Sequence, residues 1–219
     1  MYSKNRNHLL LWGATGQAIV LNEFLEDNGF QLSCLFDRNK KVESPFNGIP
    51  IFHDKENLLN FISRFEELYF GVSIGGDGGR DRLQIHHLLK SYGLKPATLI
   101  HPQSHIASDA KVEKGSQILI NATICSRVEI GREVIVNSSS SIDHECHIAD
   151  GVHIGPGSVL SGSVEVGSCT FIGSGSVVLP RVKIGKNTTI GAGSVVTKNI
   201  PDNVVAFGNP CSLVRKKSE

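Results

Sequence analysis

Histidines and a cysteine gather in the second half of the chain, where they could carry out proton or acyl chemistry. His144 is followed directly by Glu145 and Cys146, and His147 and His153 come shortly afterwards. A histidine can act as a general base near neutral pH, three histidines can hold a catalytic zinc ion, and a cysteine can carry an acyl group. The direction in which the fold points each side chain decides between these chemistries.

A second set of residues lies near the N-terminus. Residues 13–17 (GATGQ) follow an apolar run and open a helical pattern, and backbone N–H groups at such a place can bind phosphate. A tight turn that needs glycine explains the same residues equally well. Asp37 ends the next predicted strand, where a dinucleotide-binding fold has its ribose-binding acid. Arg80 and Arg82 follow a glycine-rich segment and are either ligand contacts or solvated helix charges.

The elements that position the histidines are set by a six-residue repeat. From Ile100 to Val196 every sixth residue is Val, Ile or Leu, and the residue four positions later is usually small or β-branched. A helix with 3.6 residues per turn would spread this period around its circumference, whereas short strands hold it in register. The repeat therefore predicts a parallel β-helix of the hexapeptide type, with about five coils stacked roughly 4.8 Å apart.

Three hexads make one coil, so residues eighteen apart stack in a column. His144 falls at a corner and points outward, in one column with Ser126 and Gly162. His147 points out from a different face, and His153 points out from the face opposite the His144 corner. We therefore expect no metal site within one chain. Cys146 points into the coil, where a free cysteine behaves as a small apolar residue rather than as an acyl carrier.

The first hundred residues show a different pattern, that of a small parallel α/β domain of Rossmann-like type. Strands are predicted over 8–12, 30–37 and 68–75, and helices over 18–27, ended by Gly29, and over 80–93. Two prolines in residues 95–102 mark the boundary, which divides the chain into domains 1–97 and 98–219. Residues 198–217 are expected to cover the open end of the last coil.

Composition excludes several classes of protein. Lys and Arg total 22 against 21 Asp and Glu, a net charge of +1, so the chain offers no basic field for nucleic acid or anionic lipid. No apolar run has the roughly 20 residues of a membrane helix, and the N-terminus does not read as a secretory signal. The five cysteines are scattered without CxxC spacing. We expect a cytoplasmic protein with reduced thiols that binds neither nucleic acid nor membrane.

Several segments together resemble a known family. They are LLLWGATGQA, GVSIGGDGGRDRL, HPQSHIASDAKVEKG, SSIDHECHIADGVHIGPG and VVAFGNPCSLVRK. The chain resembles the hexapeptide-repeat acyltransferases, and among them the bacterial nucleotide-sugar N-acetyltransferases that act on 4-amino-4,6-dideoxy (bacillosamine-type) sugars and the sialic acid O-acetyltransferases. The resemblance implies a left-handed β-helix, acetyl-CoA as co-substrate without a metal, and a homotrimer with active sites between subunits.

The resemblance also implies roles for individual residues. His144 would be the general base that takes the proton of the attacking amine, and Glu145 would hydrogen-bond to its ring. Acetyl-CoA would lie along His153 and the backbone near Ser174 and Ala192. The residues implied to contact the nucleotide sugar are Thr15, Gly16, Gln17, Asp37 and Arg38, with Gln17 standing where relatives often have histidine.

Three functions remain open at this point. The first is N-acetylation of a nucleotide-linked amino sugar by direct attack on the thioester, without a covalent enzyme intermediate. The second is O-acetylation of a sialic acid or similar sugar. The third is a non-catalytic nucleotide-binding trimer. Because His144 and His153 point from opposite sides of the coil, the base and most CoA contacts are expected to come from neighbouring chains.

Overall fold

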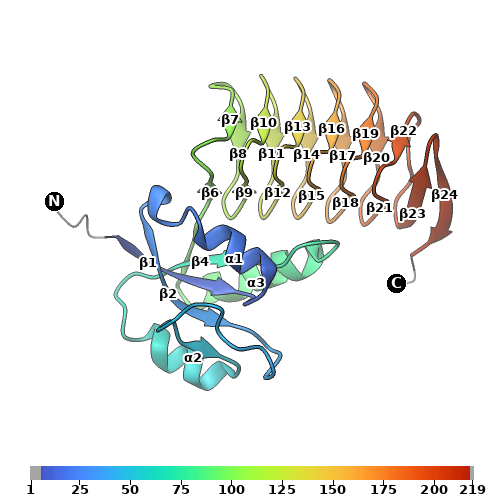
Figure 1. Cartoon of the computed structure of the whole chain (residues 1–219). Coiled ribbons are helices and arrows are strands. Elements are labelled where there is room, and N and C mark those ends of the chain that lie inside the picture. The colour runs from blue at the N-terminus through green and yellow to red at the C-terminus, as the bar shows by residue number, and fades with distance from the viewer. Residues whose placement is uncertain (1–5, 218–219) are drawn as a thin grey trace.

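The computed structural model describes residues 6–217 and consists of a β-helix with an α/β domain packed against its side (Figure 1). Seventeen two-residue strands, β6 to β22, form three parallel sheets that we call faces I, II and III. Each strand pairs with the strand one coil away, so Ile124 lies beside Ile106 and Ile142. These parallel sheets of short repeated strands confirm the hexapeptide β-helix and fit its left-handed form.

The strands are assigned to the faces as follows. Face I holds β6 (Leu99–Ile100), β9 (Gln117–Ile118), β12 (Ile135–Val136), β15 (His153–Ile154), β18 (Phe171–Ile172) and β21 (Thr189–Ile190). Face II holds β7 (His105–Ile106), β10 (Thr123–Ile124), β13 (Ser141–Ile142), β16 (Val159–Leu160), β19 (Val177–Val178) and β22 (Val195–Val196). Face III holds β8 (Lys111–Val112), β11 (Glu129–Ile130), β14 (His147–Ile148), β17 (Glu165–Val166) and β20 (Lys183–Ile184).

The core of the β-helix consists of the aliphatic residues that the repeat predicts. Each of them from Ile118 to Val196 is buried, because its side chain points into the coil between two neighbouring coils. Ile100, at the open end of the first coil, is 36% exposed. At the other end, β23 (Val204–Gly208) and β24 (Cys211–Lys216) form an antiparallel hairpin, and β23 pairs with β21 to extend face I. The buried Val204 and Ala206 close the core.

The N-terminal domain is a five-stranded parallel sheet with the order β3-β2-β1-β4-β5. Its strands are β1 (Asn7–Trp12), β2 (Phe30–Phe36), β3 (Ile51–Phe52), β4 (Tyr69–Val72) and β5 (Lys95–Pro96). Helix α1 (Gly16–Asn22) shares one apolar cluster with the sheet, whereas α2 (Lys55–Ile62) and α3 (Gly79–Ser91) share another. The predicted helix over 18–27 is shorter than expected: α1 ends at Asn22, and a 3-10 turn, η1 (Glu26–Asn28), precedes Gly29.

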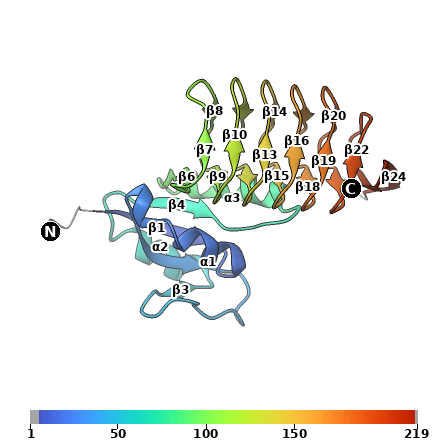
Figure 2. The same ribbon diagram turned by 45° about the horizontal axis from the view of Figure 1, so that its top comes forward.

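The two domains are joined by buried contacts on face I. Leu119 and Ile135 of the β-helix belong to the apolar cluster of α1. Helix α3 lies along the β-helix, with its first turn against the corner at Gly151 (Figure 2). This packing fixes the N-terminal sheet relative to the coils. None of the helices in residues 6–217 is long and apolar enough to cross a bilayer.

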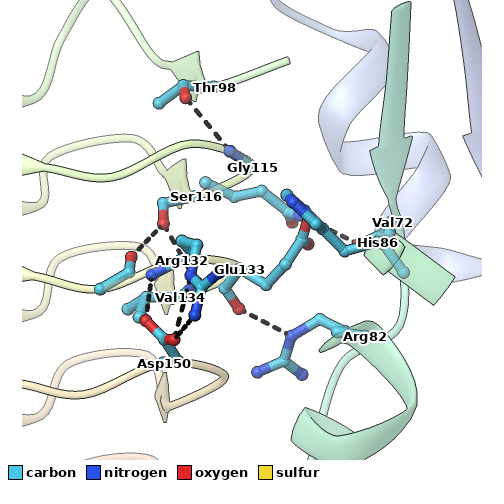
Figure 3. A network of polar contacts seen from close by, with 12 residues as sticks. Val72, Arg82, His86, Thr98, Gly115, Ser116, Arg132, Glu133, Val134 and Asp150 are labelled. Carbon is cyan, nitrogen blue, oxygen red and sulfur yellow. Dashed lines mark hydrogen bonds and ion pairs between the residues drawn. The ribbon is translucent and has the colours of Figure 1, made fainter. Parts of the chain in front are cut away.

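A buried arginine forms the polar centre of this interface (Figure 3). Arg82 of α3 is fully buried and donates hydrogen bonds to four backbone carbonyls, those of Glu133, Ile74, Gly151 and Val152, at 2.6–3.2 Å. Such contacts are needed because a buried guanidinium without partners is strongly unfavourable. Of the two alternatives for Arg82, the solvated helix charge is therefore wrong.

Beside Arg82, a histidine and a glutamate pair across the same interface. His86 Nδ1 lies 2.7 Å from Glu133 Oε1, and both side chains are buried. Burial raises the pKa of the Glu133 carboxyl, partly offset by the hydrogen bond to His86. Helix α3 is thus attached to the coil by two polar side chains, Arg82 and His86, one helical turn apart.

Candidate active site

His144 lies at the corner between β13 on face II and β14 on face III. Its Nδ1 is 3.1 Å from Oε2 of Glu145, and the two side chains are 56% and 48% exposed. Glu145 has a φ of +59°, the left-handed conformation of a corner residue, which turns its carboxylate back toward the imidazole. The backbone N–H of His144 donates to Asp143 Oδ1 at 2.8 Å. Nε2 of His144 therefore remains available to exchange a proton with a ligand.

The carboxylate of Glu145 has a second partner from the preceding coil. Arg127 Nη1 lies 3.3 Å from Glu145 Oε1, so the two carboxylate oxygens contact different side chains. Below it, Asp109 accepts a hydrogen bond from Ser126 Oγ at 2.7 Å and one from the Arg127 N–H at 3.3 Å. The corner column thus carries a connected polar chain that ends at the imidazole of His144.

His153 projects from face I, as expected, but it is covered by the N-terminal domain. It is only 5% exposed. Its Nδ1 lies 3.1 Å from the carbonyl oxygen of Gly76, and its Nε2 lies 3.1 Å from Asn137 Nδ2. Burial, and next the charge of Arg82, lower the pKa of His153 to about 4. The ring is therefore neutral at pH 7, with Nδ1–H donating to Gly76 and Nε2 accepting from Asn137.

Ser174 and Ala192 lie exposed at the corner between faces I and II, in successive coils. Each follows a glycine, Gly173 or Gly191, and the equivalent position of the preceding coil is also a glycine, Gly155. A Cβ at Gly155 would lie 2.7 Å from the Ser174 nitrogen, and one at Gly173 would lie 2.5 Å from the Ala192 nitrogen. Within the described residues neither of these N–H groups donates to a backbone carbonyl. The corner therefore presents two backbone donors, and the exposed side chain of Phe207 lies beside Gly191 at the end of this edge.

The predicted nucleotide contacts line one cavity in the N-terminal domain. Thr15, Gly16, Gln17, Asp37 and Arg38 all border a space of about 580 Å³ at the carboxyl ends of β1, β2 and β4. This volume suits a small-molecule ligand. Parallel α/β sheets bind ligands at this edge, where the strand order changes direction between β2, β1 and β4. The structure therefore brings these five residues together around one pocket.

Two of these residues also hold the pocket in shape. Asp37 accepts hydrogen bonds from the N–H groups of Ala14 at 3.1 Å and Asn39 at 2.9 Å, which joins the loops after β1 and β2. Gln17 Nε2 donates to Gln117 Oε1 at 2.7 Å, and Gln117 Nε2 donates to the carbonyl of Val72. Gln17 thus connects the pocket to face I of the β-helix.

The remaining histidines and cysteines do not converge on His144. His147 lies on face III with Nδ1 3.4 Å from Glu129 Oε2 and is 61% exposed. Cys146 is 1% exposed inside the coil, and burial raises its pKa to about 11, which disfavours the thiolate. Within residues 6–217, no cluster of three or more His, Cys, Asp or Glu side chains is placed to hold a metal ion.

Comparison with known proteins agrees with this architecture. Residues 163–198 match the family described as "Bacterial transferase hexapeptide (six repeats)". A mutant of perosamine N-acetyltransferase from Caulobacter crescentus, in complex with CoA and GDP-perosamine, has a TM-score of 0.88 at 27% identity and covers 96% of this chain and 98% of that chain. The acetyltransferase domain of PglB from Neisseria gonorrhoeae, in complex with acetyl coenzyme A, has a TM-score of 0.84 at 29% identity and covers 95% and 100%.

A curated relative gives the same result at the level of sequence. GDP-perosamine N-acetyltransferase of Escherichia coli O157:H7 is 34% identical over 98 residues, which span 45% of this chain and 43% of that protein. The chain is similar to hexapeptide-repeat transferases in sequence over part of its length and in structure over most of it. The predicted resemblance is therefore confirmed at the level of the family.

Several residues of the candidate site had no sequence-based prediction. Arg127 contacts Glu145, and Asn137 contacts His153. Arg127 could have been found from the column rule, because it stands eighteen residues before Glu145. Trp12, Ser73 and Gln84 also line the cavity of the N-terminal domain. Gln84 comes from α3, and only the docking of that helix beside β4 brings it to the pocket.

Proposed function

We propose that this chain is an acetyl-CoA-dependent N-acetyltransferase that acts on the amino group of a nucleotide-linked 4-amino-4,6-dideoxy sugar. The observation that carries the proposal is the contact between His144 Nδ1 and Glu145 Oε2 on an exposed corner, which leaves Nε2 directed away from the carboxylate. Two relatives named for N-acetylation of perosamine support the reaction, and one of them contains CoA and GDP-perosamine.

The proposed mechanism is direct transfer of the acetyl group from CoA to the sugar amine, without an acetyl-enzyme intermediate. The sugar amine attacks the thioester carbonyl, and Nε2 of His144 takes a proton from the nitrogen as the C–N bond forms. The tetrahedral intermediate collapses, the C–S bond breaks, and the CoA sulfur leaves with the proton held by His144. Glu145 stabilises the imidazolium that exists between the two proton transfers. Cys146 takes no part, because its thiol is buried and protonated.

We further propose that each active site is shared between two subunits of a homotrimer. His144 lies at the corner of faces II and III, whereas Ser174 and Ala192 lie at the corner of faces I and II, so one chain does not bring them together. Face II also carries an exposed aliphatic stripe. Val159 in β16 is 41% exposed and Leu179, directly after β19, is 38% exposed, and two neighbouring aliphatic side chains at this place suit contact with a second copy.

In this arrangement the two domains have separate roles. Residues 1–97 would bind the nucleotide sugar in the cavity bordered by Asp37 and Arg38, in a Rossmann-like manner. Residues 98–219 would provide the base and the acetyl-CoA edge formed by Ser174 and Ala192. His153 would contribute to that edge as a neutral ring rather than as an acid, because its pKa is lowered to about 4.

The proposal is tested by thiol release from acetyl-CoA with a panel of acceptors. The panel contains GDP-, UDP- and dTDP-linked 4-amino-4,6-dideoxy sugars and a free sialic acid. The wild type is compared with His144→Ala and with His147→Ala, a matched control that removes an equally exposed histidine from face III. We expect turnover of one amino sugar, loss of at least about 100-fold in His144→Ala, and no change in the control.

The other outcomes decide between the alternatives. Turnover of sialic acid alone would assign the chain to O-acetylation. Nucleotide binding without turnover of any acceptor would support a non-catalytic trimer. Equal activity of His144→Ala and the wild type would remove His144 from the mechanism.

A further inference from the structure

Gly162 occupies a corner position where the fold itself does not need glycine. The position is the second residue after each repeat aliphatic, and it occurs seventeen times between residues 102 and 198. Its occupants are Pro102, Ser108, Lys114, Ile120, Ser126, Arg132, Ser138, His144, Asp150, Pro156, Gly162, Ser168, Ser174, Pro180, Lys186, Ala192 and Lys198. Gly162 is the single glycine among them. The coil therefore accepts side chains, and even proline, at this position.

The backbone conformation of Gly162 does not require glycine either. The corner residues with positive φ are those one position later, such as Glu145 at +59° and Ser163 at +58°. Gly162 is not among the residues with positive φ. Alanine could adopt its backbone without strain. The reason for glycine must lie in what surrounds it.

What surrounds it is the imidazole of His144, which stands one coil earlier in the same column. A Cβ built on Gly162 would lie 2.5 Å from Nε2, 2.6 Å from Cε1 and 3.2 Å from Cδ2 of His144. Non-bonded carbon atoms normally keep about 3.5–4.0 Å from each other. The ring therefore lies in the volume that any side chain at position 162 would occupy.

We infer that Gly162 is a positioning residue for His144, and this inference rests on the proposed function. Its missing side chain leaves the space that the imidazole of His144 occupies. With the ring in this space, Nδ1 lies 3.1 Å from Glu145 Oε2, and the opposite edge of the ring, with Nε2, lies beside Gly162 of the next coil. A methyl group at 162 would push the ring outward, away from Glu145, and would displace the base from its substrate.

The kinetic test uses Gly162→Ala and Gly162→Ser. A misplacement of a catalytic group by about 1 Å can cost on the order of 100-fold in rate. We expect kcat to fall by about that factor while the KM for acetyl-CoA changes by less than about twofold, because Gly162 is not among the residues proposed to bind acetyl-CoA. Ser168→Ala, at the equivalent position of a different corner, is the control and should keep the wild-type kcat.

A second test does not depend on activity. Gly162→Ala is made in the wild type and in His144→Ala, and Tm is measured for all four proteins. In the wild type the methyl group collides with the ring, so we expect Tm to fall by about 2–5 °C. In His144→Ala the collision is absent, and the alanine should leave Tm unchanged or raise it, because it restricts the unfolded chain.

The outcomes separate this inference from the proposed function. Equal Tm changes in both backgrounds would mean that the ring does not occupy this space and would overturn the inference. A wild-type kcat in Gly162→Ala would overturn it as well. If no sugar in the panel is acetylated, the proposed function fails, whereas the Tm cycle still decides whether Gly162 makes room for His144.

Discussion

Arg127 Nη1 lies 3.3 Å from Oε1 of Glu145, whose other oxygen contacts His144. The arginine and the glutamate stand eighteen residues apart and meet because one coil of the β-helix separates them. The same spacing pairs Lys111 with Glu129 and Lys183 with Glu165 on face III. An ordinary cross-coil ion pair has thus been placed next to the candidate base.

Arg127→Ala should reduce kcat modestly. The ion pair is exposed, with side chains 73% and 48% accessible, so it is worth about 0–1 kcal/mol, which corresponds to a loss of at most about fivefold. Steady-state kinetics with saturating acetyl-CoA would measure the change. Lys111→Ala removes an equally exposed pair from face III and serves as the control. A loss of several hundredfold in Arg127→Ala would mean that the arginine binds substrate directly.

Mixed trimers test whether two subunits share each site. His144→Ala removes the proposed base, and Ala192→Trp would block the proposed acetyl-CoA edge at an exposed position. Each variant alone should be inactive. When both are combined in equal amounts in a cyclic trimer, about a quarter of the sites receive a normal residue from both neighbours, and activity should recover to that fraction. Activity that stays at the level of the single variants would place the whole site within one chain.

Much of the β-helix could be predicted from the sequence because its rule is local. Every sixth residue from Ile118 to Val196 is buried as the period requires, and the outward direction of His144 and inward direction of Cys146 follow from position alone. The polar cross-coil pairs follow from the same rule. Columns of residues eighteen apart include Arg132 and Asp150, which form an ion pair at the corner of faces III and I.

The packing between domains could not be predicted in this way. The sequence left Arg82 as either a ligand contact or a solvated helix charge, and only the docking of α3 on the coil places it among four backbone carbonyls. His153 points outward, as the repeat requires, yet the loop at Gly76 covers it. Contacts between distant segments decided both of these cases. Helix α2 had no sequence-based prediction either, although Leu58, Phe61 and Ile62 have helical spacing and Asp54 caps its first turn.

Arg82→Met should destabilise the protein strongly. The substitution leaves the carbonyls of Glu133 and Gly151 buried without their donor and removes the positive charge near the Glu133 carboxyl. Removal of one partner from a buried charged network typically costs about 3–5 kcal/mol. Urea unfolding would measure the loss. Arg80→Met, two positions earlier on the exposed side of α3, should change stability by less than about 0.5 kcal/mol.

The stability of the protein should depend on pH through His153. Its pKa in the folded protein is lowered to about 4, whereas an unfolded histidine titrates near pH 6.5. Between these values the unfolded chain binds a proton that the folded chain excludes, so the free energy of unfolding falls as pH drops from about 6.5 to 4. A shift of this size corresponds to at most about 3 kcal/mol.

His153→Gln provides the comparison, because glutamine can accept and donate hydrogen bonds but does not titrate. Unfolding free energies at pH 7.5 and pH 5 would be compared for the wild type and the variant. We expect the wild type to lose more stability than His153→Gln over this interval, because only the wild type has the histidine that titrates. The buried carboxyl of Glu133 is present in both proteins, so its contribution cancels in the comparison. Identical losses would mean that the ring of His153 becomes protonated in the folded state. In that case it would be open to solvent and able to act as an acid at the acetyl-CoA edge.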